Sequence, residues 1–194
     1  MSDRPRLGVS ACLLGQSVRY DAGHKRDDWL VDVLGPLVEW VAVCPEVEAG
    51  FGTPRETMQL VWKRGQGVAL LTTETARDVT TTMRRFADRR IEELAGANLS
   101  GYVFKADSPS CGVAGVPLIT SRPDPIPAGC AAGEVSTGSG LFAAALISRL
   151  PDLPIADERR LADPDARQWF VERVFAHHRA RKIDVHSQRG RIEA

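Results

Sequence analysis

The sequence lacks long apolar runs and any excess of charge of one sign. No stretch approaches the ~20 consecutive apolar residues that cross a bilayer, so no membrane span is predicted. Lysine and arginine together number 25, as do aspartate and glutamate, which makes the formal net charge +0. A neutral chain has no general attraction for nucleic acid or for an anionic membrane surface, so we expect neither as a partner.

Cysteine is also scarce, with four in 194 residues, and no two of them form a Cys-x-x-Cys pair. The polar start, residues 1–6, has neither the basic stretch nor the apolar run of a secretion signal, so we expect a cytoplasmic protein. In the cytosol cysteines bind metals or act in catalysis more often than they form disulfides. The spacing of Cys12, Cys44 and Cys111 matches neither a zinc finger nor a ferredoxin. Spacing alone therefore leaves two interpretations open: a metal site, or small buried side chains that pack as apolar residues.

Strand-like and helix-like segments alternate along the chain, which is typical of an α/β fold. Strands are expected over residues 6–14, 38–43, 58–62, 67–71 and 101–105, and helices over 28–37, 75–97, 139–150 and 163–181, with 112–140 mostly loop. This order predicts a single α/β domain over residues 1–182, in which a mainly parallel sheet is flanked by helices in a Rossmann-like, three-layer arrangement. Residues 183–194 are expected to form a polar, mobile tail.

The three cysteines Cys12, Cys44 and Cys111 each lie at or just after the end of a predicted strand. In parallel sheets ligands bind beyond the carboxyl ends of the strands, so we expect these cysteines to share one site. Their sequence neighbours are polar, which is unusual for cysteines that only fill a core. These neighbours are Glu46, Glu48, Arg55, Lys105, Ser108 and Ser110. The polar company favours a metal site over simple packing.

Five ordered motifs surround the cysteines. They are Ser10-Ala11-Cys12-Leu13-Leu14-Gly15, Val18-Arg19-Tyr20-Asp21, Cys44-Pro45-Glu46-Val47-Glu48-Ala49-Gly50, Thr53-Pro54-Arg55-Glu56, and Lys105 with Ser108-Pro109-Ser110-Cys111-Gly112. Over about residues 6–150 the chain thereby resembles the thiouracil desulfidase family.

The resemblance implies an enzyme that holds a [4Fe-4S] cluster through Cys12, Cys44 and Cys111. The fourth iron would stay open for the sulfur of a small-molecule substrate, a thiolated pyrimidine. The resemblance also implies catalytic roles for Glu46 and Ser108. A Lewis-acidic iron makes the thiocarbonyl carbon electrophilic, Glu46 would activate the attacking water, and Ser108 would orient the ring or relay a proton. Sulfide would leave in a hydrolytic reaction.

Cys130 lies outside the shared motifs, and we interpret it as a spare loop cysteine, because a fourth ligand would close the open iron. Two other hypotheses remain open. A non-catalytic module would store or sense a metal such as zinc through the same three cysteines. A nucleotide-binding regulator would hold an anion at the Gly138-Ser139-Gly140 helix entry, although a tight turn explains these glycines equally well.

Overall fold

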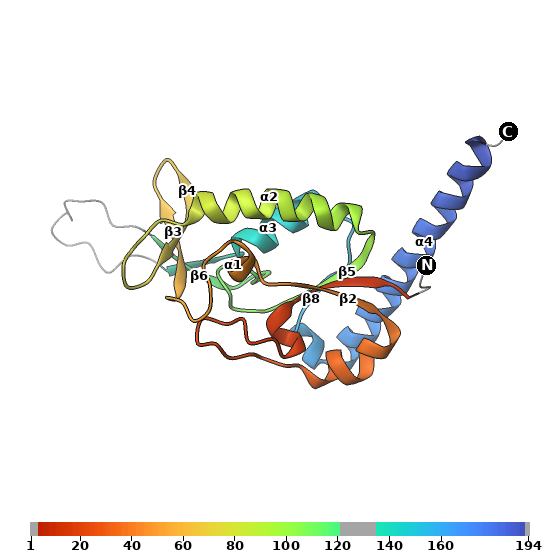
Figure 1. The fold of residues 1–194 in the computed structure, drawn as a ribbon, viewed down its shortest axis with the longest axis horizontal. Coiled ribbons are helices and arrows are strands. Elements are labelled where there is room, and N and C mark those ends of the chain that lie inside the picture. The colour runs from red at the N-terminus through yellow and green to blue at the C-terminus, as the bar shows by residue number, and fades with distance from the viewer. Residues whose placement is uncertain (1–3, 121–134, 193–194) are drawn as a thin grey trace.

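The computed structural model describes residues 4–120 and 135–192, with side chains described as far as Arg181 (Figure 1). The strands are β1 (Arg6–Ser10), β2 (Glu39–Val43), β3 (Met58–Lys63), β4 (Gly67–Thr72), β5 (Leu99–Phe104), β6 (Val116–Thr120), β7 (Val135–Gly138) and β8 (Ile155–Asp157). The α-helices are α1 (Pro45–Glu48), α2 (Thr80–Gly96), α3 (Leu141–Arg149) and α4 (Pro164–Ile192). Short 3₁₀ or π-helical turns are η1 (Ala11–Leu14), η2 (Trp29–Leu34), η3 (Gly35–Leu37) and η4 (Arg160–Ala162).

The central sheet has the strand order β2-β1-β5-β8, and every pair in it is parallel. All six residues of β5 are buried, as expected for an inner strand covered on both faces. A glycine on β1 permits the close packing: a Cβ on Gly8 would lie 2.1 Å from a ring carbon of Tyr102 on β5. The parallel order places the carboxyl ends of β1, β2, β5 and β8 along one edge of the sheet.

The two faces of this sheet are covered by different helices. On one face Tyr102 and Phe104 pack in a core with the buried side chains of α2 and α3. On the other face Val103, one residue between them, packs with Phe170 and Val174 of α4. The alternation follows the two-residue period of a strand. The expected α/β fold with a parallel sheet between helices is thus confirmed, and Figure 1 shows α4 extending away from the sheets.

A second sheet, absent from the prediction, has the order β4-β3-β6-β7. Strands β3 and β6 run parallel, whereas β3–β4 and β6–β7 are antiparallel pairs. Its buried side chains Leu60, Leu70 and Leu118 extend the core beneath α2. The expectation that residues 112–140 are mostly loop is therefore wrong at β6 and β7, while Cys130 lies outside the described residues.

Several predicted boundaries also differ. The first strand ends at Ser10 and continues as the turn η1, so Cys12 lies just beyond a strand. The long helix begins at Thr80 rather than at 75, and the last helix runs to Ile192 rather than to 181. The expected helix over 28–37 is divided into η2 and η3. Among the helices of the described residues, none combines the length and apolar character needed to cross a membrane.

Candidate metal and active site

A cavity of about 470 Å³ lies beyond the carboxyl ends of β1, β2 and β5. The strand-end residues Ser10 and Val43 form part of its wall, and the turns that follow the strands supply most of the rest. All five predicted site residues line this one cavity: Cys12, Cys44, Glu46, Ser108 and Cys111. The three cysteines are free thiols. The expectation that strand order would bring them together is therefore met by the structure.

Cys44 is positioned by the short helix α1. It follows β2 directly and precedes Pro45, whose fixed φ suits the first position of a helix. The backbone N–H of Cys44 donates to Glu48 Oε1 at 2.9 Å, and the other oxygen of Glu48 lies 3.0 Å from Arg90 of α2. The Cys44 thiol donates a long hydrogen bond, 3.6 Å, to the carbonyl of Val18. The backbone bond to Glu48 thus holds the turn without sulfur, and the thiol adds a second, longer contact.

Cys12 is carried by the 3₁₀ turn η1 and is buried. Its carbonyl accepts the N–H groups of Gly15 at 3.2 Å and Lys25 at 2.9 Å, which fixes the turn against the following loop. Gly15 adopts a φ of +86°, a left-handed conformation that favours glycine over other residues. Backbone geometry therefore fixes the position of the Cys12 side chain at the cavity wall.

Cys111 lies in a tight turn whose centre is Ser108. The hydroxyl oxygen of Ser108 accepts the N–H groups of Ser110 at 3.2 Å and Cys111 at 3.1 Å. The start of α3 packs closely against this turn: a Cβ on Gly140 would lie 2.5 Å from the carbonyl carbon of Ser110. Only glycine fits there without displacing the turn.

The first amides of α3 are also used by the Cys111 turn. The N–H of Gly140 donates to the Gly112 carbonyl at 2.8 Å, Leu141 donates to Pro109 at 3.1 Å, and Phe142 donates to Ser110 at 3.1 Å. These bonds explain the glycine pair of the Gly138-Ser139-Gly140 entry as a tight turn. They leave the nucleotide-binding hypothesis without support at this helix start.

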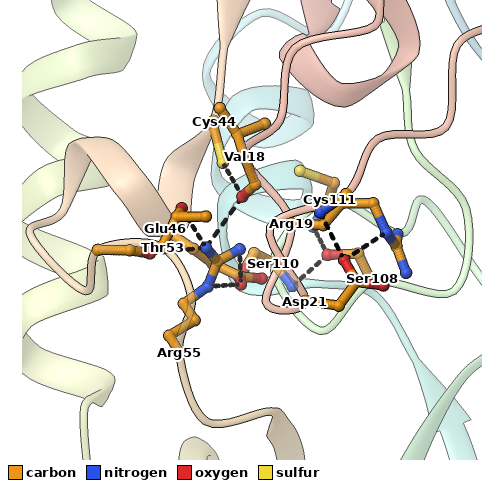
Figure 2. Close-up of polar contacts among 12 residues, drawn as sticks. Val18, Arg19, Asp21, Cys44, Glu46, Thr53, Arg55, Ser108, Ser110 and Cys111 are labelled. Carbon is orange, nitrogen blue, oxygen red and sulfur yellow. Dashed lines mark hydrogen bonds and ion pairs between the residues drawn. The ribbon is translucent and has the colours of Figure 1, made fainter.

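Glu46 is held on both carboxylate oxygens (Figure 2). Arg55 approaches Oε2 through Nε and Nη2, each at 2.7 Å, and the two side chains are only 7% and 14% exposed. The hydroxyl of Ser110 donates to Oε1 at 2.9 Å. The sequence pointed to Glu46 but assigned no role to either of its partners. In the sequence, Arg55 and Ser110 are visible only as polar residues within the shared motifs.

Burial raises the pKa of all three thiols. The pKa of Cys12 rises to about 11, first through burial and then through the nearby Cys44. Burial likewise raises the pKa of Cys44, and it raises that of Cys111 well above the usual value despite a hydrogen bond with Ser10. The thiols are consequently protonated at neutral pH in the metal-free chain. Because thiolates are the metal-binding form, loading a metal must displace their protons.

Basic side chains also line the cavity, namely Arg19, Lys25, Arg55 and Lys105. Lys105 pairs with Glu158, which also accepts the N–H of Ala106 at 2.7 Å. Glu158 directly follows β8, a strand of three residues that sequence periodicity did not reveal. It therefore lies at the same sheet edge as the cysteines, a position that no pattern in the sequence indicated. Positive charge at this wall favours thiolates over thiols, since Lys105 and Arg19 both act to lower the pKa of Cys12.

Within residues 4–120 and 135–192, no three histidine, cysteine, aspartate or glutamate side chains are placed to hold a single metal ion. The three thiols instead share the wall of a larger cavity. The fold and this wall define an α/β protein whose candidate active site gathers three thiols and a carboxylate at one edge of a parallel sheet.

Comparison with known proteins places this architecture in a family. The 2-thiouracil desulfurase family matches residues 7–158, and the chain belongs to that family. The uncharacterized protein YbbK of Bacillus subtilis (strain 168) is 32% identical over 142 residues, covering 71% of this chain and 87% of YbbK. A solved structure, the [4Fe-4S]-dependent thiouracil desulfidase TudS, is 30% identical with a TM-score of 0.60, covering 82% of this chain and 94% of that one. The resemblance inferred from the five motifs is confirmed.

Proposed function

We propose that the chain is a [4Fe-4S]-dependent desulfidase that converts thiolated pyrimidines into the corresponding oxygenated bases. The observation that carries the proposal is the convergence of Cys12, Cys44 and Cys111 with Glu46 around one cavity, in a member of the 2-thiouracil desulfurase family. The overall reaction balances as hydrolysis: water supplies the oxygen, the C=S bond breaks, and sulfur leaves as sulfide. It consumes no external electrons.

The residues present fit such a cluster. Iron–sulfur clusters are held by cysteine thiolates, and three free thiols from separate turns line a cavity large enough to admit more than one atom. Cys12, Cys44 and Cys111 would be the ligands. When bound, the cluster would supply a Lewis-acidic iron with a position open to the substrate sulfur. The similarity to TudS, which is described as [4Fe-4S]-dependent, supports the choice of cofactor.

Glu46 would act as the general base for the water that attacks the ring carbon. Arg55 occupies Oε2 through two nitrogens, whereas Oε1 accepts, among the residues that the structure describes, only the hydroxyl of Ser110. A carboxylate oxygen has two lone-pair positions, so Oε1 retains one for a further donor. Because Glu46 lines the cavity, Oε1 is the atom that would take the proton of water.

Ser108 would serve as a hydrogen-bond donor. Its oxygen already accepts two backbone N–H groups, those of Ser110 and Cys111, which use both of its lone pairs. Its remaining capacity is one O–H, and the residue lines the cavity. Of the two roles open from the sequence, orientation of the pyrimidine by donation to a ring acceptor is thus favoured over proton relay.

Anaerobic reconstitution followed by metal analysis and a 2-thiouracil assay tests the proposal. We expect about four irons with sulfide per chain, and release of uracil and sulfide in equal amounts. Cys12→Ser, Cys44→Ser and Cys111→Ser should each lose iron and activity, whereas Cys130→Ser, the matched control, should retain both. One zinc and no turnover would instead establish the non-catalytic metal module.

A further inference from the structure

The buried hydrogen-bond network around Glu46 indicates roles for the residues that contact it, and this inference rests on the proposed function of Glu46 as base. We propose that Arg55 and Ser110 are positioning residues that fix this carboxylate so that only Oε1 faces the reaction. Neither residue is given a role by the family motifs alone.

Arg55 is tied down by four different acceptors. Beside Glu46, the two N–H groups of Nη1 are shared among three oxygens, the carbonyls of Val18 at 2.9 Å and Gly52 at 2.8 Å and the hydroxyl of Thr53 at 3.3 Å (Figure 2). A guanidinium held by three backbone or side-chain oxygens on one nitrogen has a fixed plane. Its Nε and Nη2 are therefore held in fixed positions beside Oε2, and the carboxylate of Glu46 cannot rotate without losing both contacts.

Ser110 completes the restraint from the other side. It is fully buried, and its hydroxyl donates to Oε1 at 2.9 Å. The two serines of the Ser-Pro-Ser-Cys motif consequently have separate roles. Ser108 lines the cavity, while Ser110 lies behind the carboxylate and acts only through Glu46. One lone pair of Oε1 is left as the site of proton acceptance.

The same arginine joins the base to the wall that carries a thiol. The carbonyl of Val18 accepts both the Arg55 guanidinium and the Cys44 thiol. The bond from Arg55 is the shorter of the two, at 2.9 Å against 3.6 Å for the thiol. Arg55 thus connects the carboxylate of Glu46 to the same backbone carbonyl that the Cys44 thiol contacts.

A double-mutant cycle in the anaerobically reconstituted protein tests this coupling. With 2-thiouracil as probe, Arg55→Ala should lower kcat by about 100-fold, the scale of a misplaced general base, with a much smaller change in KM. In a Glu46→Gln background the same change should lower kcat by less than about threefold, because a positioning residue has nothing left to position. Added guanidinium should restore part of the activity of Arg55→Ala but none of that of Glu46→Gln.

Iron and acid-labile sulfide content provide a readout independent of turnover, and both should equal those of the wild type in Arg55→Ala. Arg149→Ala, which removes an exposed arginine paired with Glu92 at 3.0 Å, is the matched control and should leave kcat unchanged. If Arg55→Ala fails to fold, Ser110→Ala removes a single hydroxyl from the same network. It should lower kcat in the wild-type background and not in Glu46→Gln.

The outcomes separate this inference from the proposed function. Equal losses from Arg55→Ala in both backgrounds, or a fall in kcat that only follows a fall in iron, would overturn the positioning role while leaving an active desulfidase. A fully loaded wild type that releases no sulfide from 2-thiouracil would overturn the proposed function, and this inference with it.

Discussion

Replacement of Gly140 by alanine should damage the candidate site from outside the cavity. The added Cβ would lie 2.5 and 2.6 Å from the carbonyl carbon and oxygen of Ser110, and 2.9 Å from the amide nitrogen of Cys111. All three neighbours are backbone atoms of the turn that carries a candidate ligand, so no flexible side chain can move aside. Relief requires the turn and α3 to separate by roughly 0.9 Å at the closest contact.

The magnitude follows from two opposing effects. Overpacking of this kind costs ~1–3 kcal/mol, and the hydrogen bonds from the first amides of α3 to the turn, each worth ~1 kcal/mol, would lengthen. Gly140 has a φ of −60° and a ψ of 147°, which alanine adopts freely, so reduced freedom of the unfolded chain returns ~0.4–1 kcal/mol. We expect a net loss of about 2–3 kcal/mol in the free energy of unfolding.

Urea unfolding of the reduced, metal-free protein measures this loss, and iron content after reconstitution measures the effect on the site. Gly96→Ala is the matched control, since Gly96 ends α2 and nothing lies within 4 Å of its added Cβ. The control should be neutral or stabilised by up to ~1 kcal/mol. If Gly140→Ala unfolded at the same urea concentration as Gly96→Ala and bound as much iron, the claim that this contact holds the ligand turn would be refuted.

Three further predictions concern the fold. Burial penalises the Cys12 thiolate and raises its pKa to about 11 in the folded chain, against 9.0 when unperturbed, so the metal-free protein should lose about 3 kcal/mol of stability as the pH rises from 9 to above 11. Urea unfolding of Cys12→Ala over the same pH range should show a smaller loss. Asp78 accepts the N–H of Thr80 at 3.0 Å where α2 begins, so Asp78→Ala should cost ~1 kcal/mol in thermal unfolding and leave the kcat for 2-thiouracil unchanged. Gly8→Ala would drive a Cβ to 2.1 Å from the Tyr102 ring, so a loss of ~3 kcal/mol or more is expected, and native-like circular dichroism with unchanged stability would contradict it.

Features set by local sequence were the predictable part of the fold. Within the helix expected over residues 75–97, the apolar residues Val79, Met83, Phe86 and Leu94 recur at the spacing of one helix face, and all four are buried against the core. The same reasoning failed for the shorter helical segment before β2, where Val33 and Leu37 are 57% and 52% exposed. There the chain changes from π-helical to 3₁₀ geometry, so a 3.6-residue period does not describe its faces.

The second sheet was not predictable from local patterns because its pairing is remote in sequence. Residues Val116–Thr120 form the strand β6 because they pair with β3 and β7. Strand β7 contains Ser136, Thr137 and Gly138, which are residues that also suit a loop. Glu158 was missed for a related reason. Strand β8 has only three residues, and it forms a strand because it pairs with β5, with Phe104 opposite Asp157. Tertiary pairing overrides weak local preference in both places.

The residues of the candidate site were easier to predict from the sequence than the hydrogen bonds between them. The rule that parallel strands end together was enough to gather Cys12, Cys44 and Cys111. The separate roles of Ser108 and Ser110 were not, because they depend on which way each side chain leaves the turn. A sequence motif states which residues are present, whereas the direction of a donor is a property of the folded backbone.

The anchoring of the three cysteines also bears on how the site would load. Cys12 is held through its carbonyl, and Cys44 and Cys111 are held through their amides. None of these backbone bonds uses sulfur, so we expect the three turns to keep their shape before a metal is bound, unlike a zinc finger. The raised pKa of each thiol opposes metal binding, because each thiol must lose its proton before it can bind a metal. In such a site the free energy of metal–sulfur bonding is used to ionise buried thiols rather than to fold the chain.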